Sequence, residues 1–168
     1  MSIKLEIENA NSSHAEAIKA IWNPIIRDTL KTFNAKEKST QDIKDLILER
    51  DKMGFGSLVG IRSGQVVGFT SYNQFRPGSG YLKTMEHTVI VDPKTRGQGV
   101  GKSLICTLED YAKGQGVVFF MAGVSEENTS AISFHESLGF RTISVLPEVG
   151  FKFGRFLNLV LMQKKLIS

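Results

Sequence analysis

The spacing of hydrophobic positions changes along the chain, and it first predicts a strand followed by helices. Residues 3–7 alternate between apolar and polar side chains, which is the period of a β-strand. From Ser12 or Ser13 to about Phe33 the apolar positions recur at helical spacing, so that one face is hydrophobic. Pro24 interrupts this stretch, and because proline lacks an amide hydrogen we expect it to break the helix or to start a second one.

A further helix and a run of strands follow. Residues 39–42, Ser-Thr-Gln-Asp, are typical of a helix N-terminus, and three apolar residues between 43 and 47 share one face of that helix. The period then changes to that of strands, with Ser63-Gly64 typical of a hairpin turn. The remaining pattern predicts a helix from about Val100 that stops at Gly114, a helix over 129–138, and strands at 57–62, 65–75, 81–91, 117–124, 141–146 and 153–162. This order predicts a mixed sheet flanked by helices, an α/β or α+β fold, in a single domain over residues 1–168.

Composition narrows the class of protein. Of the 168 residues, 41% are hydrophobic and 23% are charged, which is ordinary for a folded globular chain and excludes a disordered one. No apolar run approaches the roughly 18 residues of a membrane-spanning helix, and the N-terminal sequence lacks the apolar core of a secretory signal. We therefore expect a soluble, cytoplasmic protein without a membrane partner. The single cysteine, Cys106, cannot form an internal disulfide, which fits a reducing compartment.

Charge and histidine content give little reason to expect nucleic acid or metal. The net charge is +4, and the basic residues are scattered instead of forming a stripe with interleaved aromatic side chains. Such a charge permits an anionic small molecule without requiring one. The three histidines lie on separate predicted elements and have no metal-binding spacing. The sequence thus predicts no metal site and no nucleic-acid partner.

Residues 96–103, Arg-Gly-Gln-Gly-Val-Gly-Lys-Ser, carry the most informative pattern in the chain. Glycines allow backbone amides to approach a ligand closely, and the start of the following helix adds unpaired N–H groups and the positive end of its dipole. Such a segment suits a phosphate or pyrophosphate. It is neither the P-loop, which requires glycine where Arg96 stands, nor the G-x-G-x-x-G dinucleotide loop, because its glycines are spaced G-x-G-x-G. The alternative is a turn that merely caps a helix.

The spacing of Arg96, Gly99 and Gly101 resembles the acetyl-CoA loop of the GCN5-related N-acetyltransferases (GNAT), whose pattern is R/Q-x-x-G-x-G/A. A later stretch, 128–140, also matches that superfamily in its asparagine, small residue, aromatic residue and Gly-Phe pair. The resemblance implies the GNAT acyltransferase fold, acetyl-CoA as co-substrate, and transfer of an acetyl group to an amine.

Three further segments are similar to the phosphinothricin and methionine sulfoximine N-acetyltransferases of that superfamily: residues 22–33, 75–91 and 149–156. The last segment is most similar to the branch that acts on methionine sulfoximine and methionine sulfone. Members usually carry tryptophan where Phe75 and Phe156 stand here. The resemblance implies a homodimer that acetylates methionine sulfoximine, methionine sulfone or phosphinothricin by direct attack in a ternary complex.

By resemblance, two segments and one asparagine hold acetyl-CoA. Backbone amides of the glycine-rich loop would bind the pyrophosphate, and a strand would bind the pantetheine arm through main-chain hydrogen bonds. The asparagine would hydrogen-bond the cofactor, and its position also suits a helix N-cap. The expected cofactor-binding residues are Val89, Ile90, Val91, Arg96, Gly97, Gln98, Gly99, Val100, Gly101, Lys102 and Asn128.

Glu86 and His135 are the candidate catalytic residues. Strand alternation places Glu86 on one face with Thr88 and Ile90. A carboxylate in an apolar strand is energetically costly unless it is paired with a charged group or has a catalytic function. Glu86 would take the proton of the acceptor's ammonium group, directly or through water, or would only attract that group. The alternative is a solvent-exposed or salt-bridged side chain. His135 stands where many GNAT enzymes carry a tyrosine, and it would protonate the leaving thiolate or serve as a structural contact.

The acceptor is expected to carry a carboxylate and a polar head group, and the Arg76 guanidinium is the candidate partner for an anion. His87 lies on the strand face opposite Glu86, where the pattern is compatible with a core histidine and with a ligand contact. Lys152 and Arg155 would contact substrate, hold a partner chain or lie on a solvated strand face. The expected substrate-binding residues are Phe75, Arg76, Pro77, Gly78, Glu86, His87 and Thr88.

Two other functions are compatible with the same residues. One is acetylation of a different amine, such as a protein N-terminus, a polyamine or an aminoglycoside. The other is a non-catalytic module that binds acetyl-CoA.

Overall fold

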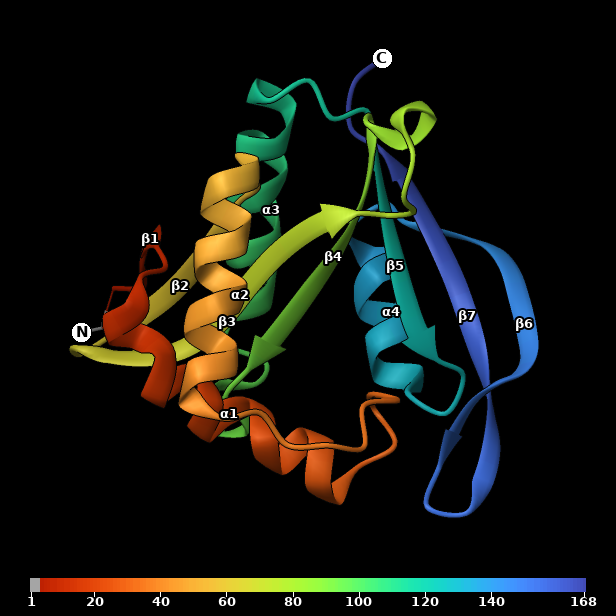
Figure 1. Ribbon diagram of the computed structural model, residues 1–168, viewed down its shortest axis with the longest axis horizontal. Helices are drawn as coiled ribbons and strands as arrows, with labels where there is room; N and C mark the ends of the chain where they lie inside the picture. The colour runs from red at the N-terminus through yellow and green to blue at the C-terminus, as the bar shows by residue number, and fades with distance from the viewer. Residues whose placement is uncertain (1–3) are drawn as a thin grey trace.

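The computed structural model describes residues 4–168 and shows one seven-stranded sheet with helices on both faces (Figure 1). The strand order is β1-β2-β3-β4-β5-β7-β6. The strands are β1 (Glu6–Asn9), β2 (Ser57–Arg62), β3 (Gln65–Gln74), β4 (Thr84–Val91), β5 (Phe119–Ser125), β6 (Arg141–Lys152) and β7 (Arg155–Lys165). The α-helices are α1 (Ala15–Asp28), α2 (Thr40–Met53), α3 (Val100–Gly114) and α4 (Thr129–Ser137). The predicted mixed sheet flanked by helices is confirmed.

The parallel pairing between β4 and β5 is short. It joins Thr84–Glu86 to Phe119–Met121, whereas the other neighbouring strands described in residues 4–168 pair antiparallel. Beyond Glu86 the two strands diverge (Figure 1). The edge of β4 that faces β5 therefore carries main-chain N–H and C=O groups that no neighbouring strand satisfies.

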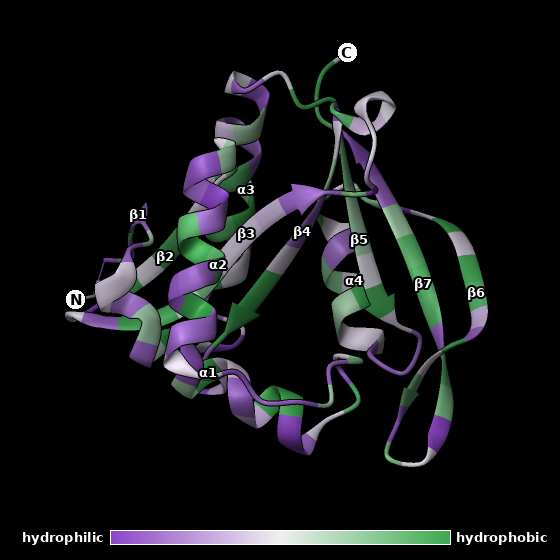
Figure 2. Cartoon of the chain, viewed as in Figure 1, coloured by the Kyte–Doolittle hydropathy of each residue, from purple (hydrophilic) through white to green (hydrophobic). Residues whose placement is uncertain are grey.

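Two hydrophobic clusters hold the helices on the sheet. One cluster lies between the sheet and the pair α1–α2 and buries Ile18, Ile43 and Phe69. The other lies under α3 and contains Leu104 and Phe120. Figure 2 shows the corresponding pattern, with hydrophobic residues concentrated along the inner strands β4, β5 and β7.

Two local sequence signals are confirmed. The Ser39 side chain accepts a hydrogen bond from the Asp42 amide, and the Asp42 carboxylate accepts one from the Ser39 amide, so that α2 begins with a capping box. Ser63 and Gly64 both have positive φ, +52° and +75°. This is the conformation of a two-residue hairpin turn, which joins β2 to β3.

The predicted break in the first helix is wrong. α1 continues through Pro24 to Asp28, after a 3₁₀ turn at Ser12–His14 that Asn11 caps, not Ser12 or Ser13. Proline removes one amide donor and leaves the carbonyl four residues earlier unpaired. That residue, Ala20, is exposed, so its carbonyl can be satisfied by solvent and the helix can continue.

Several predicted strand boundaries also shift. The strand expected from residue 81 begins only at Thr84, because Ser79–Tyr81 forms a 3₁₀ turn. β6 and β7 extend further than expected and meet at a tight turn, where Phe153 and Gly154 have φ of +52° and +74°. The first strand spans Glu6–Asn9, and the start of its predicted range, Ile3, lies outside the described residues.

Candidate active site

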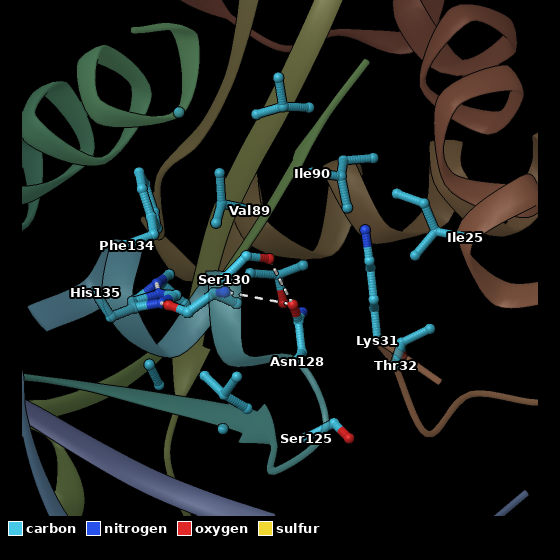
Figure 3. Close-up of a pocket in the computed structure, with 18 of the residues that line it drawn as sticks. Ile25, Lys31, Thr32, Val89, Ile90, Ser125, Asn128, Ser130, Phe134 and His135 are labelled. Atoms are coloured by element: carbon cyan, nitrogen blue, oxygen red, sulfur yellow. Dashed lines mark hydrogen bonds between the residues drawn. The ribbon is translucent and has the colours of Figure 1, made fainter. Parts of the chain in front are cut away.

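A cavity of about 660 Å³ lies where β4 and β5 separate. Its walls come from the loop between α1 and α2, from β4, from the glycine-rich loop with the start of α3, from β5 and from α4 (Figure 3). The predicted site residues that line it are Glu86, His87, Thr88, Val89, Ile90, Val91, Arg96, Gly97, Gly99, Val100, Gly101, Lys102, Asn128 and His135. The predicted residues outside its lining are Phe75, Arg76, Pro77, Gly78 and Gln98.

The glycine-rich loop offers amides and open space at the cavity. Gly97 and Gly99 have φ of +75° and +79°, and nothing lies within 4 Å of the place where a Cβ would stand. The Ser103 amide donates to the Gly99 carbonyl at 3.0 Å, so the three amides before it belong to the first turn and have no helical acceptor. Lys102 and Arg96 add positive charge. This arrangement fits a pyrophosphate group.

Gln98 differs from the sequence expectation. Its side chain points away from the cavity: Oε1 accepts from the Arg62 guanidinium, and Nε2 donates to the Lys94 carbonyl at 3.3 Å. Gln98 therefore braces the loop from behind, and its side chain does not contact a ligand in the cavity.

Alternation along β4 follows the predicted period. Met85 and Val89 pack in the cluster under α3, whereas Ile90 packs in the cluster under α1 and α2. Val89, Ile90 and Val91 also line the cavity beyond the last β4–β5 pair. Their free main-chain edge can pair with an extended polar arm as a missing strand would.

Glu86 occupies the last position at which β4 still pairs with β5. It is half-buried and lines the cavity. A Cβ on Gly123 of β5 would lie 3.0 Å from Glu86 Oε1, so the glycine leaves room for the carboxylate. Burial raises the pKa of the Glu86 carboxyl above its usual range, and the positive charge of Arg76 opposes that rise. The result is a base of raised proton affinity in a partly desolvated position.

His135 and His87 form a buried pair. The two Nε2 atoms are 2.9 Å apart, and His135 Nδ1 lies 2.7 Å from the Ala131 carbonyl oxygen. Because a carbonyl can only accept, Nδ1 of His135 carries the proton and its Nε2 accepts from the Nε2–H of His87. Burial and the neighbouring ring lower the pKa of His87 to about 3, and burial lowers that of His135. Both rings are neutral at neutral pH, and both nitrogens of His135 have partners within the chain.

The predicted substrate segment Phe75–Gly78 lies after the end of β3, outside the cavity lining. Arg76 is exposed and lies over the ring of Phe75, with its Cζ atom 5.6 Å from the ring centroid. It influences the cavity through the charge that it exerts on Glu86. Asn128 is the N-cap of α4, where its side chain accepts from the Ala131 amide, and it also lines the cavity.

The loop between α1 and α2 supplies further cavity residues. Thr32 and Phe33 belong to the segment 22–33 that resembles the family, whereas the sequence pattern does not single out Lys31. This loop is held by Lys152 of β6. The residue is 2% exposed, and its ammonium group donates to the carbonyls of Thr29 and Thr32 at 2.7 and 2.9 Å. Lys152 is thus neither a solvated residue nor part of the cavity lining. Arg155, the other basic residue of that segment, pairs with Glu127.

Gly150 strengthens the same contact between the loop and the β6–β7 hairpin. A Cβ at this position would lie 2.6 Å from Phe33 Cδ2. Only a residue without a side chain lets Phe33 pack this closely on β6. The position of the loop wall therefore depends on two residues, Gly150 and Lys152, that are more than 100 positions away in the sequence.

Two negative observations apply to the described residues. Within residues 4–168 there is no group of three or more histidine, cysteine, aspartate or glutamate side chains placed to hold a metal ion. In the same part of the chain no helix combines the length and the apolar character needed to cross a bilayer.

Comparison with known proteins identifies the family. The model of the Acetyltransferase (GNAT) family matches residues 19–140. The chain is 33% identical to the L-methionine sulfoximine/L-methionine sulfone acetyltransferase of Salmonella typhimurium over 162 residues, 96% of this chain and 95% of that protein. It is 33% identical to the phosphinothricin N-acetyltransferase of Alcaligenes faecalis over 151 residues, 89% of this chain and 77% of that protein.

A solved structure agrees with these relatives. The protein yncA of Salmonella typhimurium, solved with its cofactor acetyl-CoA, superimposes with a TM-score of 0.93 at 33% identity, covering 98% of this chain and 95% of that chain. The chain belongs to the acetyltransferase (GNAT) family. Within that family it is an N-acetyltransferase with acetyl-CoA as donor, and the predicted resemblance to the methionine sulfoximine and phosphinothricin enzymes is confirmed.

Proposed function

We propose that this enzyme acetylates the amino group of a small amino acid of the methionine sulfoximine, methionine sulfone or phosphinothricin type, by direct attack in a ternary complex. One observation carries the proposal. A half-buried carboxylate, Glu86, stands at the point where β4 and β5 separate, in the same cavity as the glycine-rich loop. The relatives named above act on these compounds and supply the acceptor class.

Acetyl-CoA supplies an activated thioester carbonyl. We propose that the amides of Gly97 and residues 99–102 bind its pyrophosphate with the charges of Arg96 and Lys102. The free edge of residues 89–91 holds the pantetheine arm through main-chain hydrogen bonds. Asn128 keeps its N-cap bond through Oδ1 and has its amide NH₂ left to donate to the donor molecule.

Glu86 is proposed as the base. An α-ammonium group must lose a proton before its nitrogen can attack a carbonyl, and a carboxylate of raised pKa is suited to take it. Arg76 would keep Glu86 ionised until the acceptor arrives. No acyl-enzyme is needed, and Cys106 is exposed on α3 outside the cavity lining.

His135 receives a different role from the one expected from the sequence. Since its two nitrogens are bonded to Ala131 and His87, we assign it to holding α4 against β4 and not to protonating the thiolate. His87 acts as the second half of this contact. Among the remaining substrate-binding candidates, Thr88 is the exposed cavity residue nearest to Glu86 along β4.

A substrate panel tests the proposal. Release of CoA from acetyl-CoA would be followed with a thiol reagent, with methionine sulfoximine, methionine sulfone, phosphinothricin, ordinary amino acids, a polyamine, an aminoglycoside and an N-terminal peptide. We expect rates well above background for at least one of the first three compounds. Faster turnover of the peptide or the polyamine would reject the proposed acceptor class.

The role of the glycine-rich loop has a matched test. Gly97 and Gly64 have the same φ, +75°, and equally open surroundings, so Gly97→Ala and Gly64→Ala carry the same backbone strain of about 1 kcal/mol. We expect only Gly97→Ala to raise the KM for acetyl-CoA, by several-fold, because only at this position would the added methyl group and the backbone strain disturb amides proposed to bind the ligand. Equal KM values in the two variants would remove Gly97 from the binding site.

We also propose a homodimer in the cytoplasm. Large hydrophobic side chains are exposed along the β6–β7 hairpin, on the outer strands of the sheet: Ile143, Val145, Val149, Phe151, Phe153 and Phe156. An apolar surface of this kind favours burial against a second copy. The unpaired Cys106 fits a reducing compartment. Light scattering at micromolar concentration should give twice the 18.6 kDa chain mass, and a monomer would contradict the proposal.

A further inference from the structure

The glycine-rich loop is exposed, and its hydrogen bonds are mostly local. Nothing lies within 4 Å of the place where a Cβ of Gly97 or Gly99 would stand, and both residues are exposed. Within residues 93–99 the Gln98 amide donates to the Thr95 carbonyl at 3.3 Å. Bonds of this kind define the shape of a turn but not its place relative to the sheet. That place matters, because an anion is bound by several amides at once.

The β2–β3 hairpin holds the start of this segment. The register between β2 and β3 shifts after Gly60, so that Val67 of β3 has no partner on β2. This is a β-bulge, a feature that is common next to binding sites, where it redirects the chain. The Val67 carbonyl accepts from the Asp92 amide at 2.8 Å. The first residue after β4 is therefore tied to the hairpin.

The same hairpin holds the other end of the segment through a side chain. Arg62 is the last residue of β2 and stands directly before the Ser63-Gly64 turn. Its guanidinium donates to Gln98 Oε1, and Gln98 Nε2 donates to the Lys94 carbonyl at 3.3 Å. In the part of the chain that the structure describes, the bond between Arg62 and Gln98 is the single hydrogen bond or ion pair that joins residues 93–99 to a distant part of the sequence.

Arg62 is suited to hold the loop because its own side chain has little freedom. The residue is half-buried, and its Nε atom is fully covered. Among residues 4–168 it forms no ion pair that would compete for the guanidinium. The guanidinium is a planar and permanently charged donor, which makes its bond to the Gln98 amide oxygen directional. Arg62 lies outside the cavity lining, so it acts on a ligand there through the loop.

We propose that Arg62 is a positioning residue for the donor: through Gln98 it holds the amides of the glycine-rich loop where the pyrophosphate of acetyl-CoA binds. This inference rests on the pyrophosphate role proposed above for the loop, and it extends donor binding to the β2–β3 hairpin. Amides that are already in place lose less conformational freedom when the anion binds. Arg62 therefore raises the affinity for acetyl-CoA without contacting it.

The test compares two donors. Acetyl-CoA carries the pyrophosphate, whereas S-acetylpantetheine carries the arm and the acetyl group without it. We expect Arg62→Met to raise the KM for acetyl-CoA about fivefold, the effect of one lost hydrogen bond, and to leave kcat/KM for S-acetylpantetheine and the acceptor KM unchanged. Calorimetry should give the same rise in the Kd of CoA with no acceptor present. Arg62→Lys keeps a charged donor and should restore most of the affinity. Arg141→Met removes the same charge from an exposed position on β6 and is the control.

A double-mutant cycle shows whether Arg62 acts through Gln98. Gln98→Leu should also weaken CoA binding, and Arg62→Met should add nothing to that loss when the two are combined. Additive losses, or normal binding in Gln98→Leu, would mean that Arg62 acts on the donor directly and would overturn the proposal. An unchanged Kd in Arg62→Met, or an equal loss with S-acetylpantetheine, would overturn it as well.

The Gly97→Ala variant separates this inference from the role of the loop on which it rests. If Gly97→Ala binds CoA as tightly as the intact enzyme, the pyrophosphate role of the loop fails, and the role of Arg62 fails with it. If Gly97→Ala binds CoA weakly and Arg62→Met binds it normally, the loop keeps its role and only the positioning by Arg62 is rejected.

Discussion

Replacement of Glu86 by glutamine will lower kcat/KM for the acceptor by about 100-fold or more, the range expected when a general base is removed. Glutamine has the size of glutamate, so it fits the space that Gly123 leaves beside it. It cannot take the proton of an ammonium group. Steady-state kinetics with a saturating donor would measure the loss, and calorimetry should show that acetyl-CoA still binds, because the glycine-rich loop is untouched.

The pH profile provides the sharper test of Glu86. Burial raises the pKa of this carboxyl, so the intact enzyme should lose kcat as the pH falls through that raised value, where Glu86 becomes protonated. Glu86→Gln should lack this acidic limb. Glu136→Gln makes the same chemical change at an exposed position on α4, and this variant should keep both the rate of the intact enzyme and its loss of kcat at low pH. An unaltered profile in Glu86→Gln would exclude Glu86 as the base.

Lys152→Met should show the second large effect, on the acceptor side of the reaction. Methionine keeps the apolar length of the side chain but leaves the carbonyls of Thr29 and Thr32 without their donor. Loss of such buried partners costs about 1–3 kcal/mol of unfolding free energy. The loop that walls the cavity would move, and we expect the acceptor KM to rise about tenfold or more while the KM for acetyl-CoA changes little.

Two further variants separate positioning from a general loss of structure. Gly150→Ala pushes against the Phe33 ring from the same hairpin and should reproduce the selective rise in acceptor KM. Lys165→Met removes an exposed lysine from β7 and should change neither KM. If both KM values rose together in Lys152→Met, the buried lysine would stabilise the whole fold and would have no specific role at the cavity wall.

Local signals predict most of the elements that line the cavity. The glycine-rich loop, the capping asparagine of α4 and the alternation along β4 each depend on residues that are close in sequence. The resemblance to the N-acetyltransferases assigns Gly97, Asn128 and Glu86 to one site, and all three line the same cavity. Predicted helix and strand boundaries are wrong where the surroundings of a residue determine its conformation. At Pro24, for example, the hydrogen bond that proline removes costs little because it lies on an exposed face of α1.

The cavity wall formed by the loop between α1 and α2 could not be predicted in the same way. Lys31 stands in an irregular loop whose position depends on Lys152 and Gly150, and no periodicity links residues so far apart. The assignment of Phe75–Gly78 to the substrate rests on resemblance, and the structure places these residues beyond the end of β3. The role expected of His135 depends on an available ring nitrogen, and only tertiary structure shows that both are engaged.

The brief pairing of β4 with β5 has a consequence for the stability of the enzyme. Three residue pairs join β4 to β5. In the binding mode proposed above, acetyl-CoA adds main-chain hydrogen bonds along β4 where β5 no longer pairs with it. A ligand that binds the folded state alone raises the free energy of unfolding, by about 2.7 kcal/mol when its concentration is 100 times its Kd. The resistance of this protein to unfolding will therefore follow the size of the acetyl-CoA pool around it.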